Sequence, residues 1–259
     1  MKANLEPKWP VAEVFGPTIQ GEGIDQGSPC HFVRFGGCDY RCSWCDTPYA
    51  VLPDEVRQLG RRTASELITE LAALPPRTRW VILTGGNPLL HDLRSFVDKL
   101  KEKDYLVAVE TQGSLWKAWL QQVDRVCISF KPPSSGMERK STLDNAERFL
   151  ARISECDLEP RTFVKVVVFD SEDLRFATQV KRLMPDGMRL YLSAGNDPGR
   201  TVSHPDKEDI RGLAEVRKDL LDSTSTLAMA VVDHPIGNMD NVFVQNQLHT
   251  ALWGNGRGF

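Results

Sequence analysis

The segment HFVRFGGCDYRCSWCDTPY (31–49) joins a short apolar run to a loop that carries three cysteines. Residues 31–35 have the length and composition of a buried strand, and two glycines follow them. Cys38, Cys42 and Cys45 then fall within eight positions. In α/β proteins the ligand site lies at the carboxyl ends of the parallel strands. The segment therefore predicts a strand that leads directly into a functional loop.

Further apolar runs recur along the chain, and several are continuous, as in strands that are covered on both faces. They are RWVILT (79–84), YLVAVET (105–111), RVCISF (125–130), FVKVVVF (163–169), MRLYLSA (188–194) and LAMAVV (227–232). Each of them is predicted to be a strand.

Helical patterns occur between these runs. In TASELITELAAL (63–74), Thr63 and Glu66 have the spacing of a capping box, and the leucines follow one stripe. The other helical patterns are HDLRSFVDKLKEK (91–103), SLWKAWLQQV (114–123), LDNAERFLARI (143–153), DLRFATQVKRLM (173–184) and DKEDIRGLAEVRKDLL (206–221). The alternation predicts right-handed βαβ units in one α/β domain over residues 1–259. A TIM-like barrel, complete or partial, fits this pattern better than a doubly wound sheet.

Polar or glycine-rich loops directly follow five of the predicted strands. Besides the cysteine loop, they are TGGNP (84–88), ETQG (110–113), SFKPP (129–133) and SAGND (193–197). We expect these loops to collect at one rim of the sheet, because the carboxyl ends of parallel strands meet there.

Composition and charge exclude some classes of function. A net charge of -3 and a pI near 6.0 argue against a broad basic surface for nucleic acid, so we expect a small-molecule partner. No apolar run reaches the length of about 18 residues that a membrane span needs, and residues 1–15 lack a signal-peptide core. We therefore expect a cytoplasmic protein, in which cysteines stay reduced. Cys30, Cys127 and Cys156 lie in or beside apolar runs and are expected to be core residues.

The cysteine loop allows three interpretations. The thiols could be packed without metal, or they could form a structural zinc site. Such a site requires four ligands, which usually occur in the sequence as two separated pairs. No second pair is present, since Cys127, Cys156 and the five histidines are scattered. The third interpretation is an iron–sulfur cluster held by three thiolates, with one iron left for a small molecule such as S-adenosylmethionine (SAM) to chelate.

The Cys-x3-Cys-x2-Cys spacing, with an aromatic residue before the last cysteine, resembles the signature of the radical SAM superfamily. Within that superfamily the chain resembles the 7-carboxy-7-deazaguanine synthase family over nearly its whole length. The segments that carry this resemblance, in order, are EVFGPTIQGEG (13–23), FVRFGGCDYRCSWCDTPY (32–49), TGGNP (84–88), VETQG (109–113), ISFKPPSS (128–135), LYLSAGND (190–197) and QLHTALWGNGRGF (247–259).

The resemblance implies a partial TIM-like (β/α) barrel with parallel strands, the radical SAM core. It also implies conversion of 6-carboxy-5,6,7,8-tetrahydropterin to 7-carboxy-7-deazaguanine with loss of ammonia, in the biosynthesis of queuosine and other 7-deazapurines. The implied cofactors are a [4Fe–4S] cluster, SAM and Mg2+. The implied partners are a reductant such as flavodoxin and a second copy of the chain in a homodimer.

Roles for individual residues follow from the same resemblance. It assigns the [4Fe–4S] cluster to Cys38, Cys42 and Cys45, and the Mg2+ ion to Thr47, whose hydroxyl oxygen suits a hard cation. The implied substrate contacts are Ile19, Gln20, Gly21, Arg34 and Thr84. The implied SAM contacts are Gly86, Glu110, Ser129, Phe130, Lys131, Ser193 and Asn196.

Two residues depart from the family pattern, and one segment is interpreted differently with the resemblance than without it. Asn87 stands where many members of the superfamily have glutamate, and Phe130 stands where relatives often have proline. The glycine-rich tail WGNGRGF (253–259) would ordinarily be frayed, yet the resemblance implies that it packs near the substrate.

Two alternatives remain beside the synthase. One is a radical enzyme that activates a protein partner, although the chain has no second cysteine-rich loop for further clusters. The other is a zinc-stabilised binding module, which would need a fourth ligand and a basic stripe.

Overall fold

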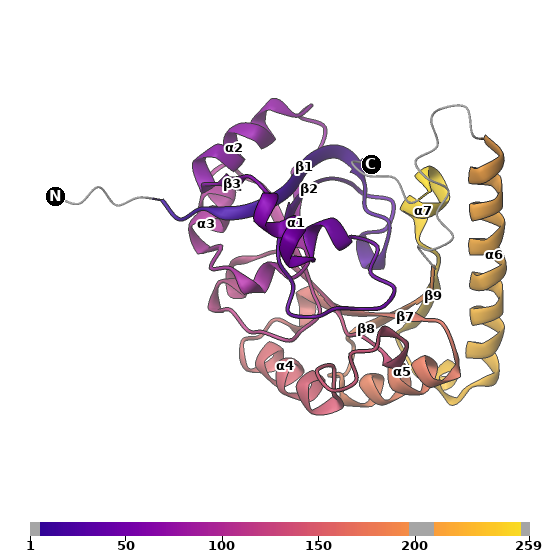
Figure 1. Cartoon of the computed structure of the whole chain (residues 1–259). Helices are drawn as coiled ribbons and strands as arrows, with labels where there is room; N and C mark the ends of the chain where they lie inside the picture. Colours follow the sequence, from indigo (N-terminus) through magenta and orange to yellow (C-terminus); the bar gives the residue numbers. More distant parts are fainter. Residues whose placement is uncertain (1–5, 197–209, 255–259) are drawn as a thin grey trace.

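The computed structural model of the chain describes residues 6–196 and 210–254. Its central element is a nine-stranded sheet. The strand order is β3-β1-β2-β4-β5-β6-β7-β8-β9, and the strands from β2 onward are parallel to one another. β1 runs antiparallel to β2 and to β3. The sheet curves without pairing its first strand with its last, which confirms the prediction of a partial α/β barrel with mostly parallel strands (Figure 1).

The strands of this sheet are β1 (Trp9–Ile19), β2 (Pro29–Phe35), β3 (Arg61–Arg62), β4 (Trp80–Gly85), β5 (Leu106–Thr111), β6 (Arg125–Ser129), β7 (Thr162–Val168), β8 (Arg189–Ala194) and β9 (Val242–Gln245). The α-helices are α1 (Pro53–Gln58), α2 (Ala64–Ala73), α3 (Arg94–Glu102), α4 (Leu143–Glu155), α5 (Ser171–Leu183), α6 (Ile210–Asp233) and α7 (Leu248–Trp253).

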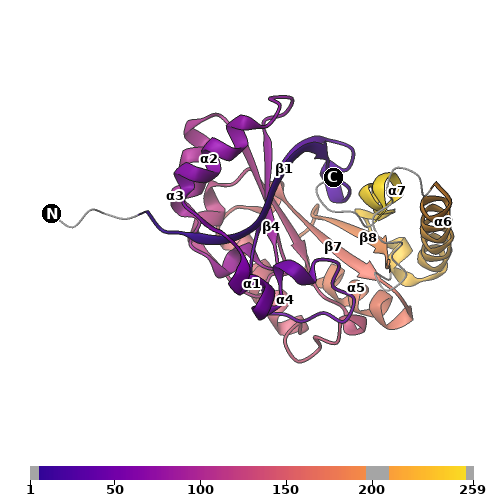
Figure 2. The same cartoon turned by 45° about the horizontal axis from the view of Figure 1, so that its top comes forward.

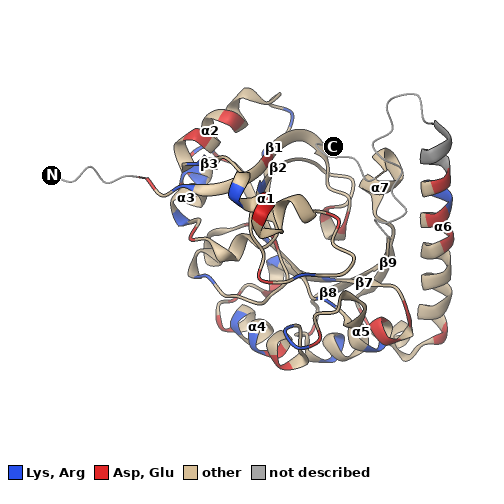
Figure 3. Cartoon of the chain, viewed as in Figure 1, with Lys and Arg blue, Asp and Glu red and all other residues tan. Residues whose placement is uncertain are grey.

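Helices α2 to α5 cover the outer face of the sheet, and α6 and α7 lie beside its last strands (Figures 1 and 2). Lysine and arginine residues are interspersed with aspartate and glutamate residues along the outer helices (Figure 3). Within the described residues, no helix is both long enough and apolar enough to cross a membrane.

The period of two along each strand divides its side chains between two environments. On β2, Val33 and Phe35 belong to the large core beneath the helices, whereas Phe32 belongs to a smaller cluster. On β7, Val164 and Val166 belong to the large core, and Phe163 belongs to a third cluster. Arg34 and Lys165 have the same parity as Phe32 and Phe163, and both line a cavity inside the barrel. The basic residues inside these apolar runs are therefore inward-facing.

The helix caps agree with the sequence patterns. The Thr63 hydroxyl accepts a hydrogen bond from the backbone N–H of Glu66, and the Glu66 carboxylate accepts one from the backbone N–H of Thr63. The capping box predicted for α2 is confirmed. The continuous sheet agrees with a single domain over residues 1–259, which stays a prediction.

The segment LAMAVV (227–232) was wrongly predicted to be a strand, because it forms the end of α6. Leu227 and Val231, four residues apart, are buried on one face of the helix, while Met229 and Val232 are exposed. A short apolar run does not by itself distinguish a buried strand from one face of a helix.

One helix was wrongly predicted and one strand was missed. The segment 114–123 forms only a short 3-10 helix, Ala118–Gln122, and not an α-helix. The strand β1, which leads into the TIQGEG segment (18–23), was not predicted. Pro10, Gly16 and Pro17 obscured β1, which tolerates them because it pairs with β3 at only two positions and has irregular register with β2.

Candidate active site

A cavity opens at the carboxyl ends of the parallel strands, where the sequence predicted a functional rim. Four of the five predicted loops contribute to it. The predicted site residues that line it are Arg34, Cys38, Cys42, Cys45, Thr47, Thr84, Gly86, Glu110, Ser129 and Lys131. The fifth loop lies elsewhere: Asn196 lines a separate cavity between the end of β8 and α6, and Ser193 is buried with its hydroxyl near Gln245.

The cysteine loop is held by backbone hydrogen bonds from neighbouring segments. The N–H of Gly37 donates to the carbonyl of Ala50, and the N–H of Asn87 donates to the carbonyl of Gly37. Gly86 packs so closely that a Cβ there would lie 2.2 Å from the Gly37 carbonyl oxygen and 2.7 Å from the Cys38 Cβ. The glycine in TGGNP is therefore needed for contact with the cysteine loop.

The three thiols share one wall of the cavity and are not in disulfides. Burial raises the pKa of Cys38, and it raises the pKa of Cys42 to about 11. Lys131 favours the charged form of both thiols. Binding to the iron atoms of a cluster would favour the thiolate form further, because cysteine binds metal in its deprotonated form. The residues present thus fit an iron–sulfur cluster.

A single metal ion fits the described residues less well. No group of three histidine, cysteine, aspartate or glutamate side chains among them is arranged around one ion. A cluster of four irons and four sulfides spaces its thiolate ligands more widely than one zinc ion does.

Asn87, in the loop after β4, has a fully buried side chain that uses all of its hydrogen-bonding capacity. Its Nδ2 donates to Asp39 Oδ1 at 2.9 Å and to Ser114 Oγ at 3.1 Å. Its Oδ1 accepts from Thr111 Oγ1 at 3.0 Å and from the backbone N–H of Leu89 at 3.2 Å. The side chain therefore links the loop after β4 to Asp39 in the cysteine loop and to Thr111 at the end of β5. It has no donor or acceptor left to bind a cofactor.

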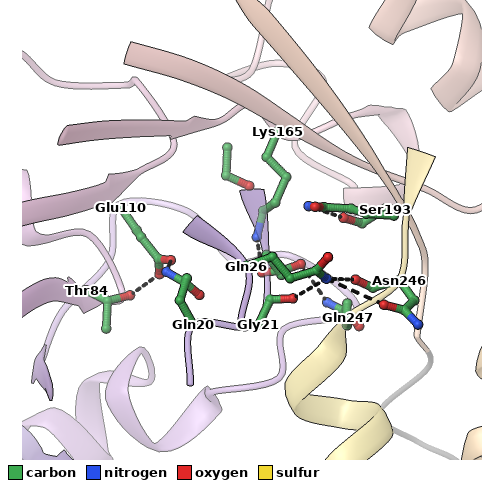
Figure 4. Close-up of polar contacts among 12 residues, drawn as sticks. Gln20, Gly21, Gln26, Thr84, Glu110, Lys165, Ser193, Asn246 and Gln247 are labelled. Carbon is green, nitrogen blue, oxygen red and sulfur yellow. Dashed lines mark hydrogen bonds and ion pairs between the residues drawn. The ribbon is translucent and has the colours of Figure 1, made fainter. Parts of the chain in front are cut away.

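Glu110 joins two predicted substrate residues (Figure 4). Its Oε1 accepts from Gln20 Nε2 at 3.0 Å, and its Oε2 accepts from Thr84 Oγ1 at 2.8 Å. The sequence placed Glu110 with the cofactor instead. Gln20 does not line the cavity itself, but it reaches the cavity wall through this carboxylate.

Arg34 faces the cavity, in agreement with its predicted role, but one side of its guanidinium is occupied. Its Nε donates to Glu13 Oε1 at 2.6 Å, and the Tyr49 hydroxyl donates to the same oxygen at 2.8 Å. Glu13 thus fixes the orientation of the guanidinium through Nε.

Phe130 belongs to the large core and packs against Gly113. Any contact that Phe130 makes with a cofactor must therefore use its backbone. Lys131, the next residue, does line the cavity, with Nζ 3.0 Å from Ser129 Oγ and 5.5 Å from the centre of the Trp44 ring.

Sequence reasoning missed a buried ion pair between Glu22 and Lys165, which both line the cavity. Burial alone would raise the pKa of Glu22, but the charges of Lys165 and His249 and the hydrogen bonds from Lys165 and Gln247 together outweigh burial and lower that pKa to about 2. Burial alone would lower the pKa of Lys165, but the surrounding negative charges, chiefly that of Glu22, together raise it. The sequence did contain a signal for this pair, because Lys165 is a basic residue inside the apolar run FVKVVVF (163–169). Arg34 occupies a similar position inside the apolar run HFVRF (31–35).

A segment near the C-terminus packs against the TIQGEG segment (Figure 4). Gln247 Nε2 donates to Glu22 Oε1 at 3.1 Å, and the N–H of Leu248 donates to the carbonyl of Gly21 at 3.0 Å. Gln26 Nε2 donates to the carbonyl oxygens of Gly21 and Asn246 at 2.9 and 2.7 Å. Ile19 ends β1 just before this contact. Of the predicted tail, residues 255–259 lie outside the described residues.

Comparisons with known proteins identify the family to which the chain belongs. The model of the Radical SAM superfamily matches residues 32–176. The 7-carboxy-7-deazaguanine synthase of Bacillus subtilis (strain 168) is 38% identical over 251 residues, covering 96% of this chain and 98% of the relative. The enzyme of the same name from Bacillus cereus is 37% identical over 97% of this chain and 99% of the relative.

Among solved structures, the fold is similar to that of QueE from Escherichia coli, with a TM-score of 0.57 and 24% identity. The similar region covers 74% of this chain and 87% of that one. At this identity the likeness concerns the fold alone.

The Glu22–Lys165 pair predicts a large effect of removing one partner. Lys165→Met should lower the free energy of unfolding by about 3–5 kcal/mol, because it leaves a carboxylate buried and unpaired. Adding Glu22→Gln to the Lys165→Met variant should recover most of this loss. Urea denaturation at pH 7 measures both effects, and equal stability of Lys165→Met and the unmodified chain would contradict them.

The same pair sets a pH dependence. The pKa of Glu22 falls from an ordinary 4.5 to about 2 on folding, so its contribution to stability is present above pH 4.5 and is lost as the pH falls toward 2. The Lys165→Met, Glu22→Gln double variant should lack this part of the acid dependence.

Proposed function

Since the chain belongs to the 7-carboxy-7-deazaguanine synthase family of the radical SAM superfamily, we propose that its cavity converts 6-carboxy-5,6,7,8-tetrahydropterin to 7-carboxy-7-deazaguanine with loss of ammonia. The observation that carries this proposal is that one cavity contains both the three thiols and the Glu110–Thr84 pair. A cluster-binding wall and a polar group suited to a pterin thus lie within reach of one bound molecule.

The superfamily uses a [4Fe–4S] cluster and SAM, which together supply a radical that abstracts a hydrogen atom from the substrate. Cys38, Cys42 and Cys45 would hold the cluster. Gly86 lets a ligand approach the backbone closely because it has no side chain. Ser129 and Lys131 offer a hydroxyl and a positive charge on the same wall. These groups would bind and orient SAM, while the cavity walls restrict access of water.

We assign Glu110 to the substrate, together with Gln20 and Thr84. A carboxylate can accept hydrogen bonds from the amino and ring N–H groups of a pterin. Arg34 would face the substrate carboxylate with its terminal nitrogens, since Glu13 already holds Nε. Gly21 and Ile19 belong to the same side of the site through the TIQGEG segment. Ser193 and Asn196, which lie outside the cavity, stay predictions.

Membership of the family also leads us to propose an additional ion, an oligomeric state, an electron donor and a location in the cell. They are a Mg2+ ion at Thr47, a homodimer, a flavodoxin-type reductant and a cytoplasmic location. In support of the first, the Thr47 hydroxyl lines the cavity 3.8 Å from Cys45 Sγ, beside Asp46.

An anaerobic assay tests the proposed reaction. Reconstituted protein should bind about four irons per chain, and it should release the deazaguanine acid when given the tetrahydropterin, SAM, Mg2+ and a reductant. A colourless protein with one zinc would instead indicate a zinc-stabilised module. SAM cleavage that occurs only with a protein partner, without turnover of the pterin, would indicate an activase.

The assignment of Thr47 predicts a selective effect on Mg2+. Thr47→Ala should raise the Mg2+ concentration that gives half-maximal activity by about tenfold or more, because an oxygen ligand is lost. Iron content should not change. Thr47→Ser keeps the hydroxyl and should respond to Mg2+ as the unmodified chain does. An unaltered Mg2+ response in Thr47→Ala would remove Thr47 from the proposed ion site.

The assignment of Glu110 predicts which ligand its substitution affects. Glu110→Gln should lower kcat/KM for the pterin by about tenfold or more, since a hydrogen bond to a charged group contributes about 1.5–3 kcal/mol. Affinity for SAM, measured by equilibrium binding to the reconstituted protein, should stay the same. The exposed Glu102→Gln on α3 is the matched control. If SAM affinity falls instead, Glu110 belongs with the cofactor, as the sequence suggested.

A further inference from the structure

The sulfur of Cys38 receives two hydrogen bonds from within the chain. The backbone N–H of Tyr40 donates to Cys38 Sγ at 3.4 Å, and the side-chain Nε2 of Gln112 donates to the same sulfur at 3.6 Å. Gln112 follows β5 and lines the cavity, although its side chain is almost completely buried. The second donor is thus a buried amide in the loop after β5, and β5 is separated from β2 by β4 in the sheet.

The other two cysteines lack such a donor. In the described part of the chain, Cys42 receives no hydrogen bond from a side chain, and Cys45 has only the Thr47 hydroxyl at 3.8 Å. Cys38 is therefore the thiol that its surroundings distinguish most clearly from the others.

Gln112 is held in one orientation. Besides Cys38 Sγ, its Nε2 donates to Asp39 Oδ1 at 2.7 Å. A carboxylate accepts hydrogen bonds and does not donate them, so the nitrogen end of the amide must face Asp39 and Cys38. Asn87 donates to the same carboxylate oxygen at 2.9 Å, which fixes Asp39 in turn.

The backbone on both sides of Gln112 is fixed as well. Thr111 donates from its hydroxyl to Asn87 Oδ1 and accepts from the N–H of Gly113. Gly113 has a φ of +73°, and a Cβ there would lie 2.7 Å from the Phe130 ring. Gln112 therefore has little freedom to turn away from Cys38.

When Cys38 is a cluster ligand, the side-chain amide of Gln112 donates to two anionic groups. One N–H donates to the Asp39 carboxylate and the other donates to the Cys38 thiolate. A hydrogen bond to a ligating sulfur draws electron density from the cluster, and such bonds help to set the reduction potential of iron–sulfur proteins. The bond is strongest when the cluster carries an additional electron, so it favours the reduced state.

We propose that Gln112 is a positioning residue that acts through Cys38 to raise the reduction potential of the [4Fe–4S] cluster. The step concerned is the uptake of one electron by the oxidised 2+ cluster to give the 1+ cluster. The proposal rests on the proposed function only in requiring that the cluster forms, and it does not depend on the identity of the substrate.

Gln112→Met tests it, because methionine has a similar length and no N–H to donate. The midpoint potential of the reconstituted protein would be measured by a dithionite titration followed by electron paramagnetic resonance, without substrate. We expect a fall of up to about 59 mV, which corresponds to a tenfold smaller reduced-to-oxidised ratio in a one-electron couple. Iron content should match that of the unmodified chain.

The chain contains a matched control. Gln121 Nε2 donates to the sulfur of Cys156 at 3.5 Å, outside the cavity. Gln121→Met removes the same type of hydrogen bond and should leave the potential unchanged. Asp39→Asn removes a negative charge beside Cys38 and should raise the potential, which is the opposite sign to Gln112→Met.

Two results would overturn the proposal. One is a Gln112→Met protein with full iron content and an unchanged potential. The other is failure of both Gln112→Met and Gln112→Leu to assemble a cluster, which would make Gln112 a purely structural residue of the loop. A Gln112-dependent potential in a chain that does not turn over the tetrahydropterin would instead count against the proposed reaction and leave this inference intact.

Discussion

The side-chain amide of Asn87 connects the ends of three neighbouring strands. Asn87 lies after β4, donates to Asp39 in the loop after β2, and accepts from Thr111 at the end of β5. Because the amide is fully buried, loss of any partner would leave a polar group unpaired, at a cost of about 1–3 kcal/mol. Asn87 therefore helps to set the position of the cysteine loop relative to the sheet.

Much of the fold could be predicted from the sequence because strand runs and helix stripes alternate regularly. The capping box at Thr63 and the apolar run of β7 were read correctly, since each depends on local chemistry. β1 was missed because Pro10 and the Gly16–Pro17 pair break its pattern, and its pairing with β2 and β3 arises only in the folded chain. The end of α6 was mistaken for a strand because its apolar run is short, and the burial that separates Leu227 from Met229 arises only in the folded chain.

The candidate site could be predicted in outline for a similar reason. Loops that follow parallel strands must meet, so the cysteines, Thr84 and Glu110 were correctly placed at one rim. Side-chain partners could not be predicted, because they depend on which residues face each other across the barrel. The Glu22–Lys165 pair joins positions that are 143 residues apart, and the contact of Gln112 with Cys38 joins positions that are 74 residues apart. Neither pair has a spacing that a sequence pattern could reveal.

The contact between the TIQGEG segment and residues 245–248 also bears on when, during synthesis of the chain, the cavity can form. Gln26 and Gly21, near the start of the chain, bind Asn246 and Leu248, which the ribosome adds more than two hundred residues later. Chains are synthesised from the N-terminus, and a single domain generally folds as a unit. The cysteine loop, Asn87 and Thr111 all emerge in the first half of synthesis, whereas Glu22 gains its bond from Gln247 only near the end. The substrate side of the cavity is thus complete only after nearly the whole chain has been synthesised.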